Sequence, residues 1–271
     1  MSTLSSDVVP GVLGVSVVLP AHNEEAVIAG VVGSCLDVLV GLVPNFEVIV
    51  VDDGSVDHTG EIADAASTRD AHVRVVHNRP QRGYGGALTE GFRAARMPLV
   101  FFMDADGQFD IHDIAPFIDR AAAGCRAVLG YRVRREDSLL RRLNAWGWNL
   151  LVRHLFKLQV RDVDCAFKLY DTSLVRLLDV HAGGAMVNAE MLAKVRRLDI
   201  EVIQLPVSHH PRRHGRSTGA NPRVVARAFG ELFGLAGYLR DWQPAAEAWP
   251  SWEVLATPAT TIDREKEQVL A

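Results

Sequence analysis

Two aspartates one residue apart, Asp104 and Asp106, are the residues of this chain with the clearest chemical potential. They follow an apolar run, residues 99–103, which predicts a buried strand. Residues i and i+2 at a strand end point the same way, so the two carboxylates should project together past the end of a sheet. Close carboxylates repel each other unless a cation lies beside them, and oxygen ligands of this kind suit Mg²⁺ or Mn²⁺, with Gln108 as a third donor. A simpler interpretation is a polar turn that opens a helix near Ile111.

Polar residues also follow two other predicted strands. The run 15–19 ends at residues 20–24, Pro-Ala-His-Asn-Glu, and the run 47–51 ends at Asp52 and Asp53. Strand-like runs begin near residues 15, 47, 73, 99 and 127, with a helix-like stretch in each gap. Repeated units of this length predict an α/β fold, a mainly parallel sheet with helices on both faces. Ligands of such sheets bind beyond the carboxyl ends of the strands, so the three polar clusters should meet in one crevice.

Two of these features have simpler interpretations. Asn23 and the acids Glu24 and Glu25 would suit the cap and first turn of a helix from about residue 24 to residue 40. The glycine-rich turn 81–88 follows the third strand and lacks the third glycine of a dinucleotide fingerprint, which argues against a dehydrogenase. Its glycines favour close packing of a helix on the sheet, or the approach of backbone to a ligand.

Charge is distributed unevenly along the 271 residues. The net charge is −4, but residues 1–130 carry −9 and residues 131–240 carry +9. The basic part could receive an anionic partner, and it lacks the interleaved aromatic residues of a nucleic-acid surface. Three cysteines without disulfide or metal spacing indicate reduced thiols in a cytoplasmic protein. No apolar run reaches the roughly 18 residues that span a bilayer, so any membrane contact is expected to be peripheral, at the cytoplasmic face.

The basic part contains two segments with two interpretations each. Residues 139–158 form a predicted helix that either packs on the core or lies on a membrane or lipid. Residues 209–217, His-His-Pro-Arg-Arg-His-Gly-Arg-Ser, form either a solvated loop or a cationic flap that closes on phosphates, since arginine forks match phosphate oxygens. The spacing of the histidines in this segment does not suit a zinc site. Residues 201–205 predict an edge strand, residues 222–239 a final helix and residues 243–271 a polar tail.

Five motifs, in this order and spacing, resemble those of family 2 glycosyltransferases of the GT-A fold, and especially the branch of dolichyl- and polyprenyl-phosphate sugar synthases. The resemblance covers about residues 15–217. It rests on Leu19-Pro20-Ala21-His22-Asn23-Glu24, Val50-Val51-Asp52-Asp53-Gly54-Ser55, Asp104-Ala105-Asp106-Gly107-Gln108, Asp162-x-Asp164-Cys165-x-Phe167-Lys168 and Arg212-x-x-Gly215-x-Ser217.

The resemblance implies a role for each matching position. Metal binding would fall to Asp104, Asp106 and Gln108, and catalysis to Asp104 and Asp106. If the acceptor is a hydroxyl, Glu190 or Asp164 would take its proton. The nucleotide sugar would be bound by Pro20, His22, Glu24, Val51, Asp53, Asp104, Ala105, Asp106, Arg132 and Arg212. His22 replaces a frequent tyrosine, Ala166 a frequent glycine, and Thr218 a frequent lysine whose loss removes one expected phosphate contact.

The resemblance also implies an activity and an organisation. The activity is metal-dependent, inverting transfer of a sugar from GDP-mannose or UDP-glucose to a polyprenyl or dolichyl phosphate. The alternatives are the same chemistry on a hydroxyl acceptor, and a nucleotide-sugar-binding subunit without turnover. Residues 1–14 would be a leader, residues 15–131 the nucleotide-sugar-binding half, residues 132–242 the acceptor-binding half of the same domain, and residues 243–271 a flexible tail.

Overall fold

The computed structural model describes residues 14–133, 139–184, 186–211 and 222–244, with the backbone alone for 139–146 and 222–228. A seven-stranded sheet forms its centre, in the order β3-β2-β1-β4-β6-β5-β7. β6 runs antiparallel to both of its neighbours, and all other pairs are parallel. The strands are β1 (Val15–Ala21), β2 (Phe46–Asp52), β3 (Val73–His77), β4 (Leu99–Met103), β5 (Ala127–Arg132), β6 (Phe167–Asp171) and β7 (Ile203–Val207).

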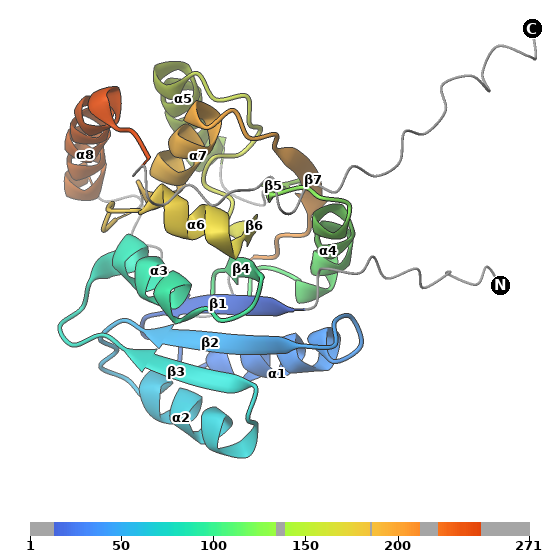
Figure 1. Cartoon of the computed structure of the whole chain (residues 1–271). Coiled ribbons are helices and arrows are strands. Elements are labelled where there is room, and N and C mark those ends of the chain that lie inside the picture. Colours follow the sequence, from blue (N-terminus) through green and yellow to red (C-terminus); the bar gives the residue numbers. More distant parts are fainter. Residues whose placement is uncertain (1–13, 134–138, 185, 212–221, 245–271) are drawn as a thin grey trace, which may run out of the picture.

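Helices cover both faces of the sheet, as the repeated units predict. The chain steps outward from β1 to β3 and then returns to β4, so right-handed crossovers place α3 on the face opposite α1 and α2 (Figure 1). The helices are α1 (Ile28–Leu39), α2 (Thr59–Arg69), α3 (Gly83–Ala94), the 3₁₀ turn η1 (Ile111–Ile114), α4 (Ala115–Ala122), α5 (Leu139–Phe156), α6 (Thr172–Leu178), α7 (Val187–Arg197) and α8 (Pro222–Asp241).

The central strands are buried on both faces, which explains why their sequences are continuous apolar runs rather than alternating ones. One aromatic side chain joins the two halves of this core. Phe167 of β6 packs against Phe101 of β4 at 4.6 Å between ring centroids, Phe117 of α4 at 5.1 Å and Phe109 at 5.6 Å. β6 is thus bound to β4 by packing as well as by backbone pairing.

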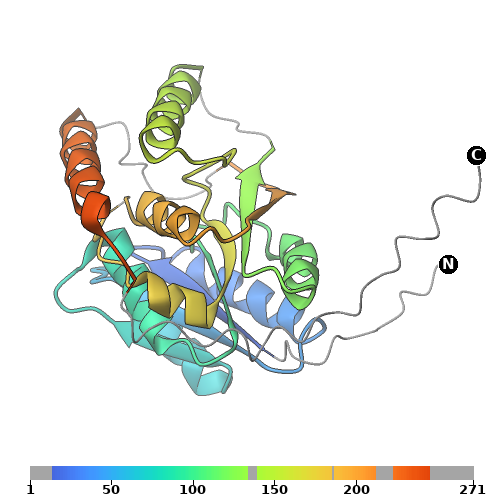
Figure 2. The same cartoon turned by 45° about the horizontal axis from the view of Figure 1, so that its top comes forward.

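Two long helices lie at the outside of the C-terminal half. α5 and α8 contact each other, and the rings of Trp148 and Phe229 meet edge to face at 5.5 Å. α7 contacts α6 and α8 and lies between α8 and the sheet (Figure 2). In the described part of the chain, every helix is too short or too polar to cross a membrane.

The structure adds one strand that the sequence did not predict and corrects one expectation. The short helix expected after residue 170 is confirmed as α6, but residues 167–171 before it form β6 inside the sheet. Asn23 does not cap a helix: its φ is 58°, its side chain accepts the backbone N–H of Val56, and α1 begins only at Ile28. The expected edge strand is confirmed as β7, which includes Pro206, a residue that sheets tolerate at their edges.

Candidate active site

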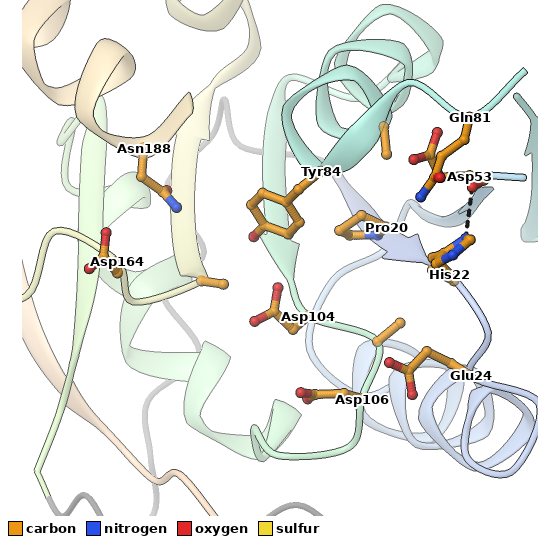
Figure 3. Close-up of a pocket in the computed structure, with 14 residues that line it drawn as sticks. Pro20, His22, Glu24, Asp53, Gln81, Tyr84, Asp104, Asp106, Asp164 and Asn188 are labelled. Atoms are coloured by element: carbon orange, nitrogen blue, oxygen red, sulfur yellow. Dashed lines mark hydrogen bonds between the residues drawn. The ribbon is translucent and has the colours of Figure 1, made fainter. Parts of the chain in front are cut away.

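The three polar clusters meet in one cavity of about 450 Å³ beyond the carboxyl ends of β1, β2 and β4, called here the strand-end pocket (Figure 3). The convergence expected from the sequence is therefore confirmed. The residues that line the pocket are Pro20, Ala21, His22, Glu24, Asp53, Gln81, Tyr84, Ala87, Asp104, Ala105, Asp106, Asp164, Ala166 and Asn188.

Asp104 and Asp106 follow β4 directly, and both carboxylates face this pocket (Figure 3). Burial, and then the negative charge of Asp106, raises the pKa of Asp104 to about 7. Two carboxylates in this position are costly to ionise together, and a divalent cation between them and a ligand removes that cost. The donor set therefore fits Mg²⁺ or Mn²⁺.

The protein offers this ion only part of its coordination shell. Among the described residues, no cluster of three or more His, Cys, Asp or Glu side chains is placed to hold a metal. Mg²⁺ in proteins commonly takes one or two carboxylates and completes its shell with water and substrate phosphates. Asp104 and Asp106 thus suit an ion that arrives with, or is completed by, a phosphorylated ligand.

Gln108, expected as a third metal ligand, points elsewhere. Its side-chain amide donates to the backbone oxygen of His210 at 2.8 Å, and its own backbone oxygen accepts the N–H of His210 at 2.8 Å. Phe109 pairs with His209 in the same short bridge. Gln108 is not among the lining residues, and these contacts join the end of the β4 loop to the segment after β7.

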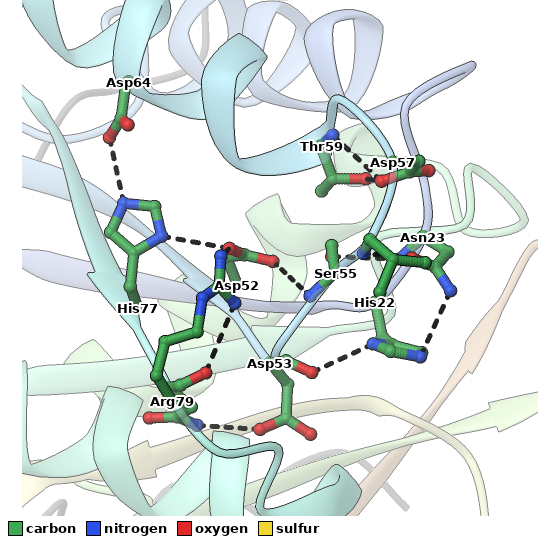
Figure 4. A network of polar contacts seen from close by, with 12 residues as sticks. His22, Asn23, Asp52, Asp53, Ser55, Asp57, Thr59, Asp64, His77 and Arg79 are labelled. Atoms are coloured by element: carbon green, nitrogen blue, oxygen red, sulfur yellow. Dashed lines mark hydrogen bonds and ion pairs between the residues drawn. The ribbon is translucent and has the colours of Figure 1, made fainter.

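Asp52, at the end of β2, is buried in a network of polar contacts (Figure 4). Its carboxylate accepts the backbone N–H of Ser55 at 3.1 Å and pairs with His77 at 3.0 Å and Arg79 at 3.2 Å. Burial works against ionisation, but these contacts outweigh it and lower the pKa of Asp52. Asp52 therefore fixes the loop that carries the next aspartate.

Asp53 joins three parts of the pocket wall. Its carboxylate accepts the backbone N–H groups of Arg82 and Gly83, both at 2.8 Å, which lie at the start of α3. Its backbone oxygen pairs with the imidazole Nδ1 of His22 at 2.9 Å. The first amides of a helix have no partner within the helix, so Asp53 caps α3 and holds the His22 ring in place at the same time.

The glycine-rich turn is in close contact with the loop 181–184. The backbone oxygen of Gly183 accepts the N–H groups of Gly85 at 3.0 Å and Gly86 at 3.4 Å. A Cβ atom on Gly85 would lie 1.9 Å from the backbone oxygen of Ala182. Gly85 is therefore required by the loop 181–184, an alternative to the two explanations that the sequence favoured.

Several expected site residues lie outside the pocket. Val51 is fully buried in β2. Arg132 forms two hydrogen bonds to Asp162, at 2.7 and 2.9 Å, and is not among the lining residues. Arg212 lies outside the described residues. Glu190 is buried below the loop 181–184 and lines a separate cavity.

The strand-end pocket also contains residues that the sequence did not single out. Tyr84 extends from the first turn of α3, with its hydroxyl toward Asp104, and Asn188 lies with Asp164 on the opposite side of the pocket (Figure 3). Behind Asn188 lies Lys168, fully buried, which donates to the side chain of Asn188 at 2.8 Å. A D-x-D motif can be recognised in a sequence, whereas a single tyrosine or lysine forms no motif. Only the position of these residues next to recognised motifs could have indicated them.

Comparison with known proteins gives a consistent result. Residues 16–178 match the family described as Glycosyl transferase family 2. Glycosyltransferase AglD of Haloferax volcanii is 33% identical over 207 residues, 73% of this chain and 33% of that protein. Undecaprenyl-phosphate 4-deoxy-4-formamido-L-arabinose transferase of Pseudomonas aeruginosa is 31% identical over 226 residues, 79% of this chain and 63% of that protein. The chain thus spans between one third and just under two thirds of the length of these relatives.

Solved structures with the same fold include glucosyl-3-phosphoglycerate synthase from Mycobacterium tuberculosis. Its complex with Mn²⁺, uridine diphosphate and phosphoglyceric acid aligns with a TM-score of 0.63 at 25% identity, over 83% of this chain and 79% of that one. Its complex with phosphoglyceric acid alone gives a TM-score of 0.62 at 26% identity, over 83% and 80%.

Proposed function

The chain belongs to glycosyl transferase family 2, and on this premise we propose that it transfers a sugar, with inversion, from a nucleoside diphosphate to the phosphate of a polyprenyl chain. The observation that carries the proposal is the strand-end pocket, in which the Asp104 and Asp106 carboxylates face the polar ends of β1 and β2. GDP-mannose and UDP-glucose are the donors of choice for a first test.

Asp104 and Asp106 would hold Mg²⁺ or Mn²⁺ against the diphosphate of the donor. Bound there, the ion supplies charge neutralisation for the departing diphosphate, an electrostatic effect that is among the largest in catalysis. The pair needs such a cation, because desolvation and the charge of Asp106 raise the pKa of Asp104 to about 7, so that the two carboxylates are not fully ionised together near neutral pH. The similar synthase whose complex contains Mn²⁺ and uridine diphosphate supports this choice of ion.

The remaining lining residues would bind the nucleotide by shape and by fixed polar groups. His22 is held by the backbone of Asp53, and Pro20, Glu24 and Ala105 complete that side of the pocket. Asp53 itself is engaged by the start of α3, so it would act on the nucleotide through the position of the helix and of His22 as much as by direct contact.

A lipid phosphate acceptor accounts for the charge of the C-terminal half. Such an acceptor is already an anion and needs little help from a base, but it needs cations around it. Residues 131–240 carry +9 in total. The relative from Pseudomonas is named for transfer to undecaprenyl phosphate. A hydroxyl acceptor is the second candidate, because Asp164 brings a carboxylate into the strand-end pocket that could take a proton.

A lipid acceptor implies contact with a membrane surface at its cytoplasmic face. Among the described side chains, large apolar groups are exposed on both outer helices, including Leu150 and Leu155 on α5 and Phe229 and Phe233 on α8. Amphipathic helices with such residues and nearby basic groups bind the interface of a bilayer without crossing it. We therefore include a peripheral membrane contact in the proposal.

The test is a transfer assay with a short polyprenyl phosphate and Mn²⁺. Radiolabelled UDP-glucose, GDP-mannose and UDP-N-acetylglucosamine are supplied in separate reactions, and label that enters the organic phase is counted. We expect transfer from one donor, and a loss of about a thousandfold in Asp106→Asn, the scale of several kcal/mol of metal-dependent stabilisation. Chelation of the metal should have the same effect.

The matched control is Asp110→Asn. Asp110 lies in the same loop but uses its carboxylate to cap η1, a role that asparagine can keep. Transfer by Asp106→Asn at the rate of the control would contradict the metal role. Release of nucleotide without lipid labelling would favour a hydroxyl acceptor, and donor binding without turnover would favour a binding subunit.

A further inference from the structure

Beside the strand-end pocket lies a second cavity of about 750 Å³ that the proposed function leaves unused. It is bounded by the start of α3, the loop 181–184, α7 and α8. Residues 81–87 contribute to both cavities: Gln81 lines both, Arg82 and Gly83 line the second cavity, and Tyr84 lines the strand-end pocket. Whatever holds this segment therefore shapes the pocket.

Glu190 is the buried anion of the second cavity, with only 1% of its surface exposed. Its carboxylate accepts the backbone N–H of His181 at 3.1 Å and that of Ala182 at 2.7 Å. Lys194, one turn further along α7, pairs with the same carboxylate at 2.6 Å. A carboxylate engaged by three donors is strongly fixed, and it lines the second cavity rather than the strand-end pocket.

The loop that Glu190 holds is the one that caps α3. Gly183 follows directly after the two anchored amides, and its backbone oxygen accepts the N–H groups of Gly85 and Gly86. Asp53 accepts two N–H groups slightly earlier in the chain, those of Arg82 and Gly83. The orphan amides of the α3 start are thus shared between a side chain of the strand-end pocket and a loop tied to Glu190.

We propose that Glu190 is a positioning residue for the strand-end pocket: it anchors the loop 181–184, whose Gly183 oxygen caps α3 and so sets Tyr84 and Gln81 against the bound nucleotide. The inference rests on the proposed function of the strand-end pocket. It gives Glu190 a role different from the proton acceptor that the sequence resemblance implied. Lys194 belongs to the same device, since it neutralises the buried carboxylate and donates to the backbone oxygens of Leu178 and Asp179 just before the loop.

The first test is the affinity for nucleotide, measured by titration calorimetry on the full chain with UDP and with GDP, each with Mn²⁺. Glu190→Gln keeps the shape of the side chain but removes its charge and one of its acceptor oxygens. We expect it to weaken nucleotide binding about tenfold, the equivalent of one charge-assisted hydrogen bond. Asp199→Asn, an exposed acid just after α7 with φ of 52°, is the control, because asparagine tolerates that backbone conformation.

A second pair of variants reaches the same contact without touching any charge. Gly85→Ala places a Cβ atom 1.9 Å from the oxygen of Ala182 and must push the loop away from α3. Gly183→Ala adds a Cβ atom on the loop side of the same contact, where the nearest atom, the backbone oxygen of Arg82, is 3.7 Å away. We expect the first alanine to weaken nucleotide binding as Glu190→Gln does, and the second to leave the affinity within about twofold. Equal effects of the two alanines would contradict the proposal.

Hydrogen exchange gives a readout that needs no ligand. In Glu190→Gln, the amides of Gly85 and Gly86 should exchange faster than in the wild type, while those of β1 and β2 stay protected. Unchanged exchange at the α3 start would overturn the positioning role even if nucleotide binding were weaker. A wild type that binds neither UDP nor GDP would instead overturn the proposed function, whatever the exchange shows.

The transfer assay separates positioning from proton transfer. A positioning residue predicts a higher KM for the sugar donor, with the pH profile of kcat unchanged. A general base predicts the reverse: in Glu190→Gln the KM would hold, kcat would fall by orders of magnitude, and the acid limb of the pH profile would disappear. That second pattern would refute the inference.

Discussion

In the half of the sheet built from β1 to β3, buried carboxylates collect backbone N–H groups, whereas in the half built from β5 to α8, buried ammonium groups collect backbone oxygens. Asp53 accepts the amides that begin α3. Lys168 donates to the oxygens of Val163 and Cys165, and Lys194 to those of Leu178 and Asp179. In both halves, buried charge thus satisfies backbone groups of the loops.

The buried charges do not by themselves account for the division of net charge, which is −9 for residues 1–130 and +9 for residues 131–240. Among the described residues of 131–240, the buried Lys168 and Lys194 are balanced by the buried Asp162 and Glu190. Because an unsatisfied buried backbone group is costly, these charges maintain the shape of the strand-end pocket from both sides. Glu190 is the exception, an acid in the basic half that holds amides, and it is paired with Lys194.

The largest expected effect comes from removing the buried cation Lys168. Lys168→Met leaves the oxygens of Val163, Cys165 and Asn188 without their donor, and we expect the free energy of unfolding to fall by about 3 kcal/mol. In the other half, Asp53→Asn keeps one acceptor oxygen and should cost about 1 kcal/mol. Urea denaturation followed by circular dichroism measures both. Equal losses would break the comparison between the halves.

A smaller effect is expected at the surface, where the two halves also differ. Phe233 of α8 is 63% exposed beside other apolar residues, whereas Val56 is an 89% exposed residue of the acidic half. We expect Phe233→Asp to reduce co-sedimentation with vesicles of equal parts phosphatidylcholine and phosphatidylglycerol by about tenfold, the value of one buried aromatic ring. Val56→Asp should leave it unchanged. Loss of binding in both variants would place the membrane contact elsewhere.

The smallest expected effect is a dependence of stability on pH in the acidic half. The hydrogen bond to Asp52, followed by that to Asp64, raises the pKa of His77 despite partial burial. A raised folded-state pKa stabilises the protein fully below the unfolded value of about 6.5, and this stabilisation is lost as the pH rises through the folded-state pKa. His77 is 36% exposed, so solvent screening limits the effect to less than about 1 kcal/mol.

The variant for this prediction is His77→Gln. It should flatten the decline in the free energy of unfolding from about pH 6.5 upward, measured by urea denaturation at a series of pH values. His154→Gln, which replaces an exposed histidine of α5, should leave the slope as it is in the wild type. An unaltered slope in His77→Gln would show that the Asp52 contact contributes little to stability.

The acidic half was predictable from the sequence because its chemistry is local. The strand 99–103 matches its predicted bounds, and β3 begins at residue 73 as predicted. Each polar cluster follows its strand directly, so the parallel topology alone brings the clusters together. The basic half depends on contacts between distant segments. The short run 167–171 contains Lys168 and Asp171, which masked a buried strand, and the lysine is buried only because the oxygens of neighbouring loops converge on it.

The position of β6 between β4 and β5 has a consequence for biosynthesis. β4 pairs with β1 on one side, and its other edge pairs with residues 167–171. While the chain is being made, the edge of a strand containing Phe101 and Phe102 therefore stays open until some seventy further residues have emerged, and open apolar edges invite pairing with other chains. A nascent chain that stalls before β6 would expose this edge. A pause in translation between β4 and β6 should therefore increase the fraction of the protein that aggregates.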